Sequence, residues 1–248
     1  MKLYISVINH GHDELITSRD TLAALAKNYT VVLRSNTPPT DTLTHYCMNA
    51  GIHLIHDGHT KGFAANNNAV FEHCQNKLGI TNKDYFLALN PDVDVTTESI
   101  EKLLSLSIAR DSDISAINLF RDEALTEYDN SIRRHHKLLS PIKSLLGMKR
   151  TDVYDKDAIS EPIDIDWAAG SFLLFKVDSY RKLGGFDEKY FMYFEDADIC
   201  RRANQLGQKV VYFPKIRAVH TAALKNRNLL SKHTIWYMCS LIKYHITY

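Results

Sequence analysis

Short apolar runs alternate with segments of helical character along most of the chain. We expect strands at residues 3–8, 29–33, 52–56, 85–89, 114–120, 172–175 and 210–213, with Pro214 ending the last one. We expect helices at residues 13–28, 42–50, 63–78, 97–110 and 199–206. Strands that alternate with helices predict an α/β fold with a mostly parallel central sheet flanked by helices.

The chain is organised around residues 84–95, where a buried strand ends in a polar turn. The apolar run 85–89 suits one strand of a parallel sheet, and Pro91 stops it because proline cannot donate to a central ladder. Asp92 and Asp94 then emerge at the carboxyl edge of the sheet, where open α/β sheets bind ligands. In an extended chain they point to the same side, which suits a divalent cation shared with phosphate oxygens. A β-turn rich in Asn, Pro and Asp is the alternative interpretation.

A second group of carboxylates follows an aromatic run later in the chain. Residues 190–194 read Tyr, Phe, Met, Tyr and Phe, and Glu195, Asp196 and Asp198 come directly after them. Apolar surroundings raise the pKa of a carboxyl, so one of these residues is a candidate general base. Acidic residues also stabilise the first turn of a helix, which is the simpler explanation. His220 stands just beyond the last predicted strand.

Two polar segments do not fit the strand and helix pattern. Residues 66–68 are three consecutive asparagines inside a predicted helix, so their side chains either bond to something or form a solvated polar face. Residues 133–137 form a basic cluster, Arg-Arg-His-His-Lys, which is either a solvated face or a contact for a pyrophosphate or an anionic membrane surface. The cluster lies in residues 121–163, which we expect to be a mobile insertion.

Composition places the chain among ordinary soluble globular proteins. It has 248 residues, 45% of them hydrophobic and 24% charged, and a formal net charge of +1, which argues against nucleic-acid binding as the main task. The four cysteines fit no metal-binding spacing and suggest reduced thiols. The opening residues predict no signal peptide, and no apolar run approaches the roughly 20 residues that span a bilayer, so we expect a cytoplasmic protein.

The last 21 residues, 228–248, mix aliphatic and aromatic residues with Lys232 and Lys243. This composition predicts an amphipathic helix that lies in a membrane interface, packs on the domain or meets a second subunit. We therefore expect a domain at 1–227 and a helical tail at 228–248, with peripheral contact to the inner face of the cytoplasmic membrane as one possible role of the tail.

Several blocks occur in an order that resembles the inverting glycosyltransferases of family 2, which have the GT-A fold. The blocks are the opening strand with its loop, then 61–68, 90–92, 167–170, 184–187, 191–196 and His220. The phrases 119–124 and 190–193 resemble bacterial rhamnosyltransferases that build cell-surface polysaccharide such as O-antigen on a polyprenyl-diphosphate-linked sugar.

The resemblance implies a role for each block. It implies a Mg²⁺ or Mn²⁺ ion held by Asp92, Asp94 and His220 against the diphosphate of a nucleotide-sugar donor. It implies that Asp196 is the base of a single in-line displacement that inverts the anomeric configuration, with Glu195 as its positioning neighbour. The implied donor contacts are Asn36, Lys61, Asn67, Asn90 and Arg227, and the residues implied beside the sugar and the acceptor are Trp167 and Gly170. Trp167 is equally well explained as a core aromatic.

The resemblance leaves the donor and the nucleoside contacts open. The leading hypothesis is transfer of L-rhamnose from dTDP-rhamnose to a lipid-diphosphate-linked saccharide, and a UDP-hexose or UDP-N-acetylhexosamine donor is the alternative. A nucleotidyltransferase or a non-catalytic nucleotide-sugar binding module is the alternative from another class. Residues 34–36 replace the Asp that the family usually has after its second strand. Residues 9–12 replace its usual Thr-Tyr-Asn pattern, so His10 and His12 are either donor contacts or exposed loop residues, and we favour the latter.

Overall fold

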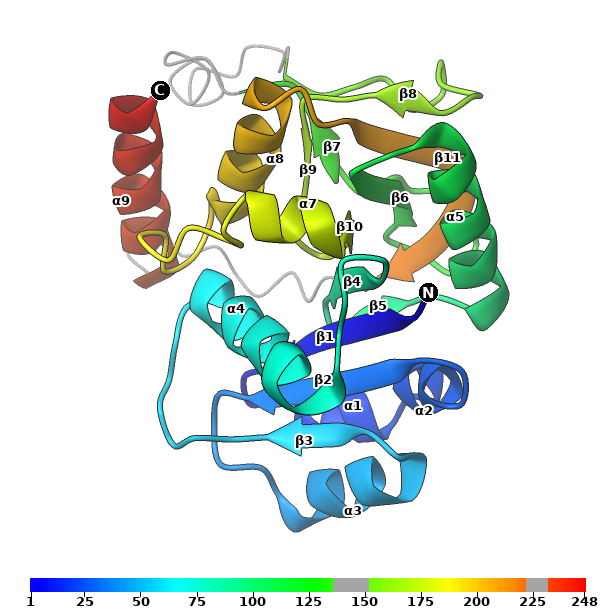
Figure 1. Cartoon of the computed structure of the whole chain (residues 1–248), viewed down its shortest axis with the longest axis vertical. Coiled ribbons are helices and arrows are strands. Elements are labelled where there is room, and N and C mark those ends of the chain that lie inside the picture. The colour runs from blue at the N-terminus through cyan, green and yellow to red at the C-terminus, as the bar shows by residue number, and fades with distance from the viewer. Residues whose placement is uncertain (136–151, 222–231) are drawn as a thin grey trace.

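The structure is a computed structural model that describes residues 1–135, 152–221 and 232–248. These residues form a nine-stranded sheet and a separate two-stranded ribbon (Figure 1). The spatial order of the sheet is β3 (His53–Ile55), β2 (Thr30–Ser35), β1 (Leu3–Asn9), β4 (Tyr85–Leu89), β10 (Phe172–Lys176), β6 (Ile114–Phe120), β11 (Val210–His220) and β5 (Val93–Asp94), and β8 (Ile163–Asp164) pairs with β11. The ribbon consists of β7 (Ile132–Arg133) and β9 (Trp167–Ala168).

The direction of the longer strands follows the predicted α/β order except at β10, and the two-residue strands β5 and β8 also run antiparallel to β11. β3, β2, β1 and β4 are parallel neighbours, as are β6 and β11. β10 is inserted between β4 and β6 and runs antiparallel to both. The start of β10 therefore lies beside the carboxyl end of β4, where the ligand edge of the sheet was expected.

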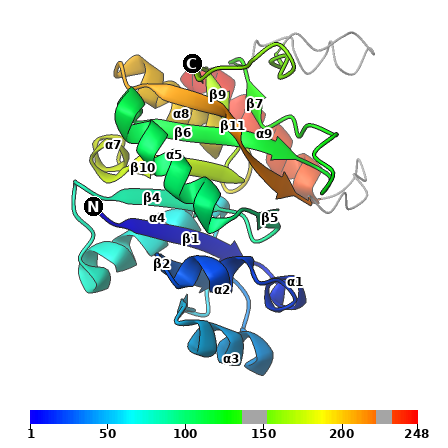
Figure 2. The same cartoon turned by 90° about the vertical axis from the view of Figure 1, so that its right-hand side faces the viewer.

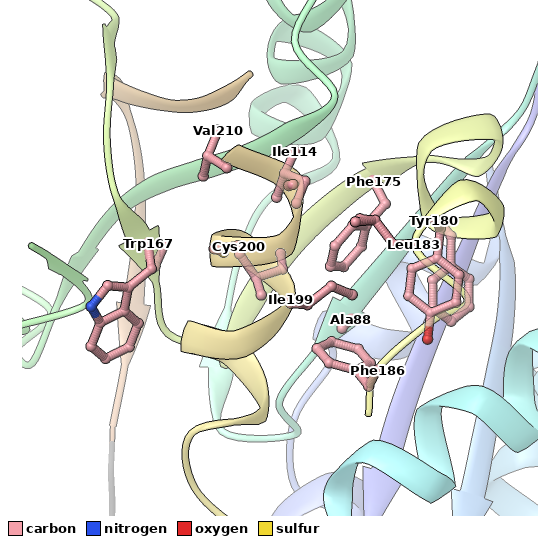
Figure 3. Packing of buried hydrophobic residues seen from close by; sticks show 14 of the residues in the cluster. Ala88, Ile114, Trp167, Phe175, Tyr180, Leu183, Phe186, Ile199, Cys200 and Val210 are labelled. Carbon is pink, nitrogen blue, oxygen red and sulfur yellow. The ribbon is translucent and has the colours of Figure 1, made fainter. Parts of the chain in front are cut away.

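Helices cover both faces of the sheet, and each face has its own apolar core (Figure 2). One face carries α4 (Phe63–His73), α7 (Val177–Lys182), α8 (Glu195–Gln205) and α9 (Lys232–Thr247), and α4 continues into a π-helical turn at Cys74–Leu78. The other carries α1 (Asp13–Thr17), α2 (Thr21–Ala26), α3 (Asp41–Ala50) and α5 (Thr97–Arg110). Figure 3 shows Ile199 and Cys200 of α8 between Trp167 and the aromatic group around Phe175. This packing fixes α8, whose first turn holds the candidate base.

Most predicted element boundaries agree with the structure to within two residues, and the reasons are local. Thr96 caps α5 by accepting a hydrogen bond from the Ser99 N–H at 3.1 Å. Gly207 follows α8 in the left-handed conformation, with φ of 72°. The three consecutive asparagines bond to protein groups, so the solvated-face interpretation of residues 66–68 is wrong.

Two expectations about the backbone are wrong. The single helix at 13–28 is two short helices, because the chain turns at Ser18–Asp20 and Arg19 reaches Asp94. Pro214 does not end the last strand: β11 continues to His220, and a shift of register between Phe213 and Arg217 accommodates the proline. Residues 131, 132, 152 and 156 are buried and residues 121–130 are exposed or half-buried, so the expected mobile insertion stays a prediction.

Candidate active site

The carboxyl end of β4 and the end of β11 meet at one edge of the sheet. The Asn90 N–H donates to the Ser171 carbonyl at 2.9 Å, and the Thr221 N–H donates to the Asp92 carbonyl at 3.1 Å. His220 is paired with Val93 in the short antiparallel ladder between β11 and β5. These backbone bonds bring Asp92 and His220 together from positions far apart in the sequence.

His220 lies between two carboxylates. Its Nδ1 is 2.6 Å from Asp129 Oδ2, and its Nε2 is 3.4 Å from Asp92 Oδ1. Burial lowers the pKa of His220, but the hydrogen bond with Asp129 and the nearby negative charges of Asp129 and Asp92 outweigh burial and raise it to about 9. Burial raises the pKa of Asp92, and the neighbouring His220 outweighs it, so the Asp92 pKa is lowered.

The Asp92 and His220 pair fits one side of a divalent-cation site. Asp92 Oδ1 is buried and accepts no hydrogen bond, and the distance to His220 Nε2 is long for one. A carboxylate oxygen is a preferred ligand of Mg²⁺ and Mn²⁺, and an imidazole nitrogen ligates a transition metal such as Mn²⁺ once it has lost its proton. Across residues 1–135, 152–221 and 232–248, no group of three His, Cys, Asp or Glu side chains surrounds a common point. A cation here would share its coordination with diphosphate oxygens and water.

Asp94, expected as a metal ligand, has other partners. Its Oδ2 is 2.7 Å from Arg19 Nη1, and its Oδ1 accepts the Thr21 hydroxyl at 2.6 Å. The sequence argument assumed an extended chain between Asp92 and Asp94. The structure has a turn there, with the Val93 N–H bonded to the Asn90 carbonyl at 3.2 Å, so the alternation of side chains does not apply. Asp94 instead ties β5 to the corner between α1 and α2.

The first turn of α8 presents the candidate base to the same edge of the sheet. Asp196 Oδ2 accepts the Gly170 N–H at 3.1 Å, and its Oδ1 accepts the Ala197 N–H at 2.8 Å. Burial raises the pKa of Asp196, against the opposing effects of these two donors and of the Arg133 charge. Gly170 directly precedes Ser171, the partner of Asn90, so Asp196 and Asp92 are connected through neighbouring backbone.

Glu195, next to Asp196, is almost fully buried. It is 6% exposed, and its Oε2 accepts no hydrogen bond. Burial and the adjacent Asp196 charge raise the pKa of Glu195 well above its usual range. A carboxyl in these surroundings holds its proton and leaves the ionised role to Asp196.

The loop before α8 is strained and held from two sides. Tyr193 and Phe194 have φ of 71° and 69°, a left-handed conformation that costs roughly 1–3 kcal/mol for a residue other than glycine. On one side the Phe63 N–H donates to the Phe191 carbonyl at 3.0 Å. On the other, Ser240 of α9 donates to the Met192 carbonyl at 2.9 Å, and the rings of Tyr237 and Tyr244 pack on Phe194. The strained conformation therefore persists because the start of α4 on one side and α9 on the other hold the loop in place.

The expected donor residues fall into two groups: Asn36 and Lys61 lie in the loops around β2 and α4, whereas Asn67 lies inside the core. Asn36 bonds to the backbone N–H and carbonyl of Lys61 at 2.9 and 2.8 Å, which joins the loop after β2 to the segment before α4. Lys61 Nζ is 3.1 Å from Asp57. Asn67 is 1% exposed, and its amide accepts from Ser6 and donates to the Phe63 carbonyl, so it links β1 to α4 inside the core.

The expected acceptor residues frame Asp196 from the side of the ribbon. A Cβ added to Gly170 would lie 3.0 Å from the Phe63 ring and 3.7 Å from Asp196 Cβ, so only glycine fits beside the base without displacing a neighbour. Trp167 is 5% exposed and donates its indole N–H to the Arg134 carbonyl at 2.9 Å, which agrees with its interpretation as a core aromatic. Arg227, His136 and Lys137 lie outside the described residues.

Comparison with known proteins identifies the family. The chain is 33% identical over 98% of its length to the rhamnosyltransferase WbbL of Escherichia coli K12, and covers 92% of that protein. The chain belongs to the rhamnosyltransferase family of glycosyltransferases. It is also 22% identical over 94% of its length to the hexosyltransferase Agl10 of Haloferax volcanii, and covers 72% of that protein. No family model matches the sequence.

A third relative of this rhamnosyltransferase family covers part of the chain. It is the N-acetylglucosaminyl-diphospho-decaprenol L-rhamnosyltransferase of Mycobacterium tuberculosis, 30% identical over 56% of this chain and 48% of that protein.

Solved glycosyltransferase structures share the fold of this family member. GalNAc-T7 in complex with UDP, GalNAc and Mn²⁺ matches with a TM-score of 0.59 and 15% identity over 89% of this chain and 44% of that chain. Staphylococcus aureus TarS with UDP-GlcNAc matches with a TM-score of 0.58 and 12% identity over 91% of this chain and 62% of that chain. The chain is a glycosyltransferase with the GT-A fold that the sequence blocks implied.

Sequence reasoning missed Asp129, which this glycosyltransferase places against His220. Nothing in the residues around Asp129 marks it, because it stands in an irregular segment that returns to the sheet edge only in three dimensions. Its N–H donates to the Leu119 carbonyl at 2.9 Å, which fixes it beside the end of β6. The second missed group is the ion pair of Arg34 with Asp57 at 2.7 Å, which stands where the family usually has an Asp.

Proposed function

We propose that this glycosyltransferase transfers L-rhamnose from dTDP-rhamnose to a saccharide linked to a lipid diphosphate, with inversion and with the help of Mg²⁺ or Mn²⁺. The substrates follow the relatives, one of which is named for a rhamnosyl transfer to an N-acetylglucosaminyl-diphospho-decaprenol. The observation that carries the proposal is the meeting at one sheet edge of a carboxylate of raised pKa, Asp196, and the Asp92 and His220 pair.

Asp196 suits the role of general base. Its raised pKa brings it closer to the range in which a carboxylate accepts a proton efficiently, and the two N–H donors hold its orientation. In the proposed step the acceptor hydroxyl attacks the anomeric carbon, the bond from that carbon to the donor diphosphate breaks, and the hydroxyl proton moves to Asp196. One displacement with one base inverts the configuration and forms no covalent intermediate.

Asp92 and His220 are the residues we assign to the cation. When bound, the cation would neutralise charge that develops on the departing nucleoside diphosphate. Asp129 Oδ2 accepts the N–H of His220 Nδ1 at 2.6 Å, which directs His220 Nε2 towards Asp92 and the cation position. Lys61, Asn36 and Asn90 remain proposed donor contacts, with Asn36 acting by holding the Lys61 backbone. Asp94 and Asn67 support the site through the structural bonds described above.

We further propose that residues 228–248 form a membrane-facing tail on a catalytic domain at 1–227. In α9, Leu241 and Tyr244 are buried against the domain, whereas Ile235, Met238, Ile242 and Ile246 are 60%, 48%, 55% and 81% exposed. The four exposed residues are spaced three or four apart and share one face, and Lys232–Thr247 contains lysines but no acidic residue. An apolar stripe with basic neighbours suits an anionic lipid surface. Among the described helices none has the length and hydropathy to cross a membrane.

Nucleoside diphosphate release from a panel of nucleotide-sugars tests the main proposal. The acceptor is a synthetic GlcNAc-diphosphate-lipid, and each reaction is run with Mn²⁺ and with EDTA. We expect acceptor-dependent release from dTDP-rhamnose that EDTA abolishes. Release from a UDP-sugar alone would support the proposed glycosyl transfer but show that dTDP-rhamnose is not the donor. Unchanged release in EDTA would show that the reaction needs no divalent cation.

A further inference from the structure

The ribbon of β7 and β9 brings a basic side chain to the wall of the proposed acceptor site. Ile132 pairs with Ala168 and Arg133 pairs with Trp167, and the Ala169 N–H extends the ladder by donating to the Ser131 carbonyl at 2.7 Å. The next residue, Gly170, donates to Asp196. The backbone of residues 167–170 therefore connects Trp167, the partner of Arg133, to Gly170, which donates to Asp196.

Trp167 is a rigid platform for Arg133. Paired residues of a ladder place their side chains on the same face, and the Arg133 guanidinium lies over the Trp167 ring, 5.5 Å from its centre. The ring cannot turn freely, because it is buried and its N–H bonds to the Arg134 carbonyl. Arg133 Nε also donates to the Asn130 carbonyl at 3.0 Å, which fixes the stem of the side chain. A guanidinium held in this way is pre-organised for an oxyanion.

The charge of Arg133 reaches the base. It contributes to lowering the pKa of Asp196, which shows that the two groups share one electrostatic environment. Arg133 is half-buried, so solvent reaches part of the guanidinium. Its position on the ribbon separates it from Asp92 and His220, which lie at the ends of β4 and β11.

We propose that Arg133, stacked on Trp167, binds the diphosphate of the lipid-linked acceptor. This inference rests on the proposed function, in which the acceptor hydroxyl contacts Asp196. In a sugar that carries a diphosphate at its anomeric carbon, the reacting hydroxyl and the diphosphate lie on the same ring. A cation whose charge acts on Asp196, and which stands on a different pair of strands from Asp92 and His220, is placed to hold that diphosphate while the hydroxyl meets Asp196. Guanidinium binds phosphate oxygens in a bidentate manner, which would also fix the orientation of the sugar.

The neighbouring arginine is a matched control. Arg134 has the same charge but its guanidinium lies over Tyr154, 4.7 Å from the ring centre, and the side chain is exposed. Loss of Arg134 removes the same charge from the ribbon without removing the group that lies on Trp167.

The test compares two soluble acceptors, GlcNAc-diphosphate on a short alkyl chain and the same GlcNAc glycoside without phosphates. The proteins are wild type, Arg133→Ala, Arg133→Gln, Arg133→Lys and Arg134→Ala, each checked by its melting temperature. We expect Arg133→Ala and Arg133→Gln to lose about 10- to 100-fold in kcat/KM for the diphosphate acceptor, the size of one charge-assisted contact, with an unchanged KM for the donor. Arg133→Lys should recover part of the loss. Arg134→Ala should stay within about threefold of wild type on both acceptors, and the Arg133 variants should lose much less on the uncharged acceptor than on the diphosphate acceptor.

A binding titration gives a readout that does not depend on turnover. Calorimetry with GlcNAc-diphosphate-alkyl should show weaker binding to Arg133→Gln than to wild type, by the same factor. Equal losses on both acceptors would show a structural role and overturn the inference. A raised KM for the donor alone would assign Arg133 to the donor diphosphate and overturn it as well. Wild-type turnover of the diphosphate acceptor with unchanged Arg133 variants would refute this inference alone, whereas absence of wild-type turnover and binding would refute the proposed function with it.

Discussion

Gly62→Ala should inactivate the enzyme by displacing the loop that carries the base. Gly62 has φ of −69° and ψ of 169°, a conformation that any residue adopts, so its backbone angles do not require glycine. The requirement is space, because a Cβ at this position would overlap the carbonyl oxygen of Phe191 and lie 2.8 Å from its carbonyl carbon and Cα. The atoms in the way are backbone, so no side-chain rotation relieves the overlap.

The size of the effect follows from this overlap. A normal contact between carbon and a carbonyl oxygen is about 3.3 Å, so the loop has to move by roughly 1 Å. Ser240 and Lys243 of α9 bond to the Met192 and Lys189 carbonyls, so the displacement passes along the loop towards α8 and Asp196. A misplacement of this size costs on the order of 100-fold in rate. Overpacking costs about 1–3 kcal/mol of stability, which corresponds to a fall of several degrees in melting temperature.

Steady-state kinetics and a thermal melt check the prediction, with Gly79→Ala as control. Gly79 has φ of 72° and nothing within 4 Å of a Cβ, so alanine there is strained by about 1–2 kcal/mol without contact to the loop. We expect both variants to melt at lower temperature and only Gly62→Ala to lose kcat. If Gly62→Ala kept kcat within about threefold of wild type, the link between the loop and the base would be refuted.

Four further outcomes are expected. Asp196→Asn should abolish transfer and leave donor binding nearly intact, and residual activity above a few per cent would exclude Asp196 as the base. Asp92→Ala should remove the dependence of donor affinity on Mn²⁺ in a calorimetric titration, and an unchanged dependence would exclude Asp92 as a ligand. Glu195 has a raised pKa in the folded protein, so the stability it confers at low pH is lost as the pH rises through that pKa. Glu195→Gln should therefore raise the melting temperature more at pH 8 than at pH 5, and an equal shift at both would contradict its buried, protonated state. Ile242→Glu should weaken flotation with anionic vesicles by about tenfold while leaving the melting temperature unchanged, and undiminished flotation would count against the exposed face of α9 as the lipid contact.

The two faces of α9 have different proposed functions. One face of α9 packs Tyr237 and Tyr244 on Phe194, which immediately precedes Glu195 and Asp196. The opposite face carries the exposed aliphatic stripe. A lipid surface in contact with the exposed aliphatic residues of α9 would touch the helix that packs on Phe194. This contact would bring Asp196, the proposed base, close to the membrane, where a lipid-linked acceptor is found.

Local sequence was sufficient for the elements whose formation depends on neighbours in the chain. The apolar run of β4 predicted a central strand, and its five residues are all buried. Thr96 caps α5 and Gly207 follows α8, and both are residue types that the local sequence favours at the ends of a helix. The local sequence also singled out Asp196 as the candidate base, because an aromatic run directly precedes Glu195 and Asp196, and the pKa of both carboxyls is raised.

Tertiary structure decided what depends on partners distant in sequence. Arg19 lies between α1 and α2 and pairs with Asp94, a partner that the spacing of Asp92 and Asp94 could not predict. β11 continues past Pro214 because β6 offers it a partner strand on both sides of the bulge. Asp129 meets His220, and Arg133 lies on Trp167, only after strands from different parts of the chain are aligned. Sequence periodicity predicts which face of a helix or strand is apolar. The role of a carboxylate or a guanidinium depends on the charged groups around it, and only the fold brings those groups together.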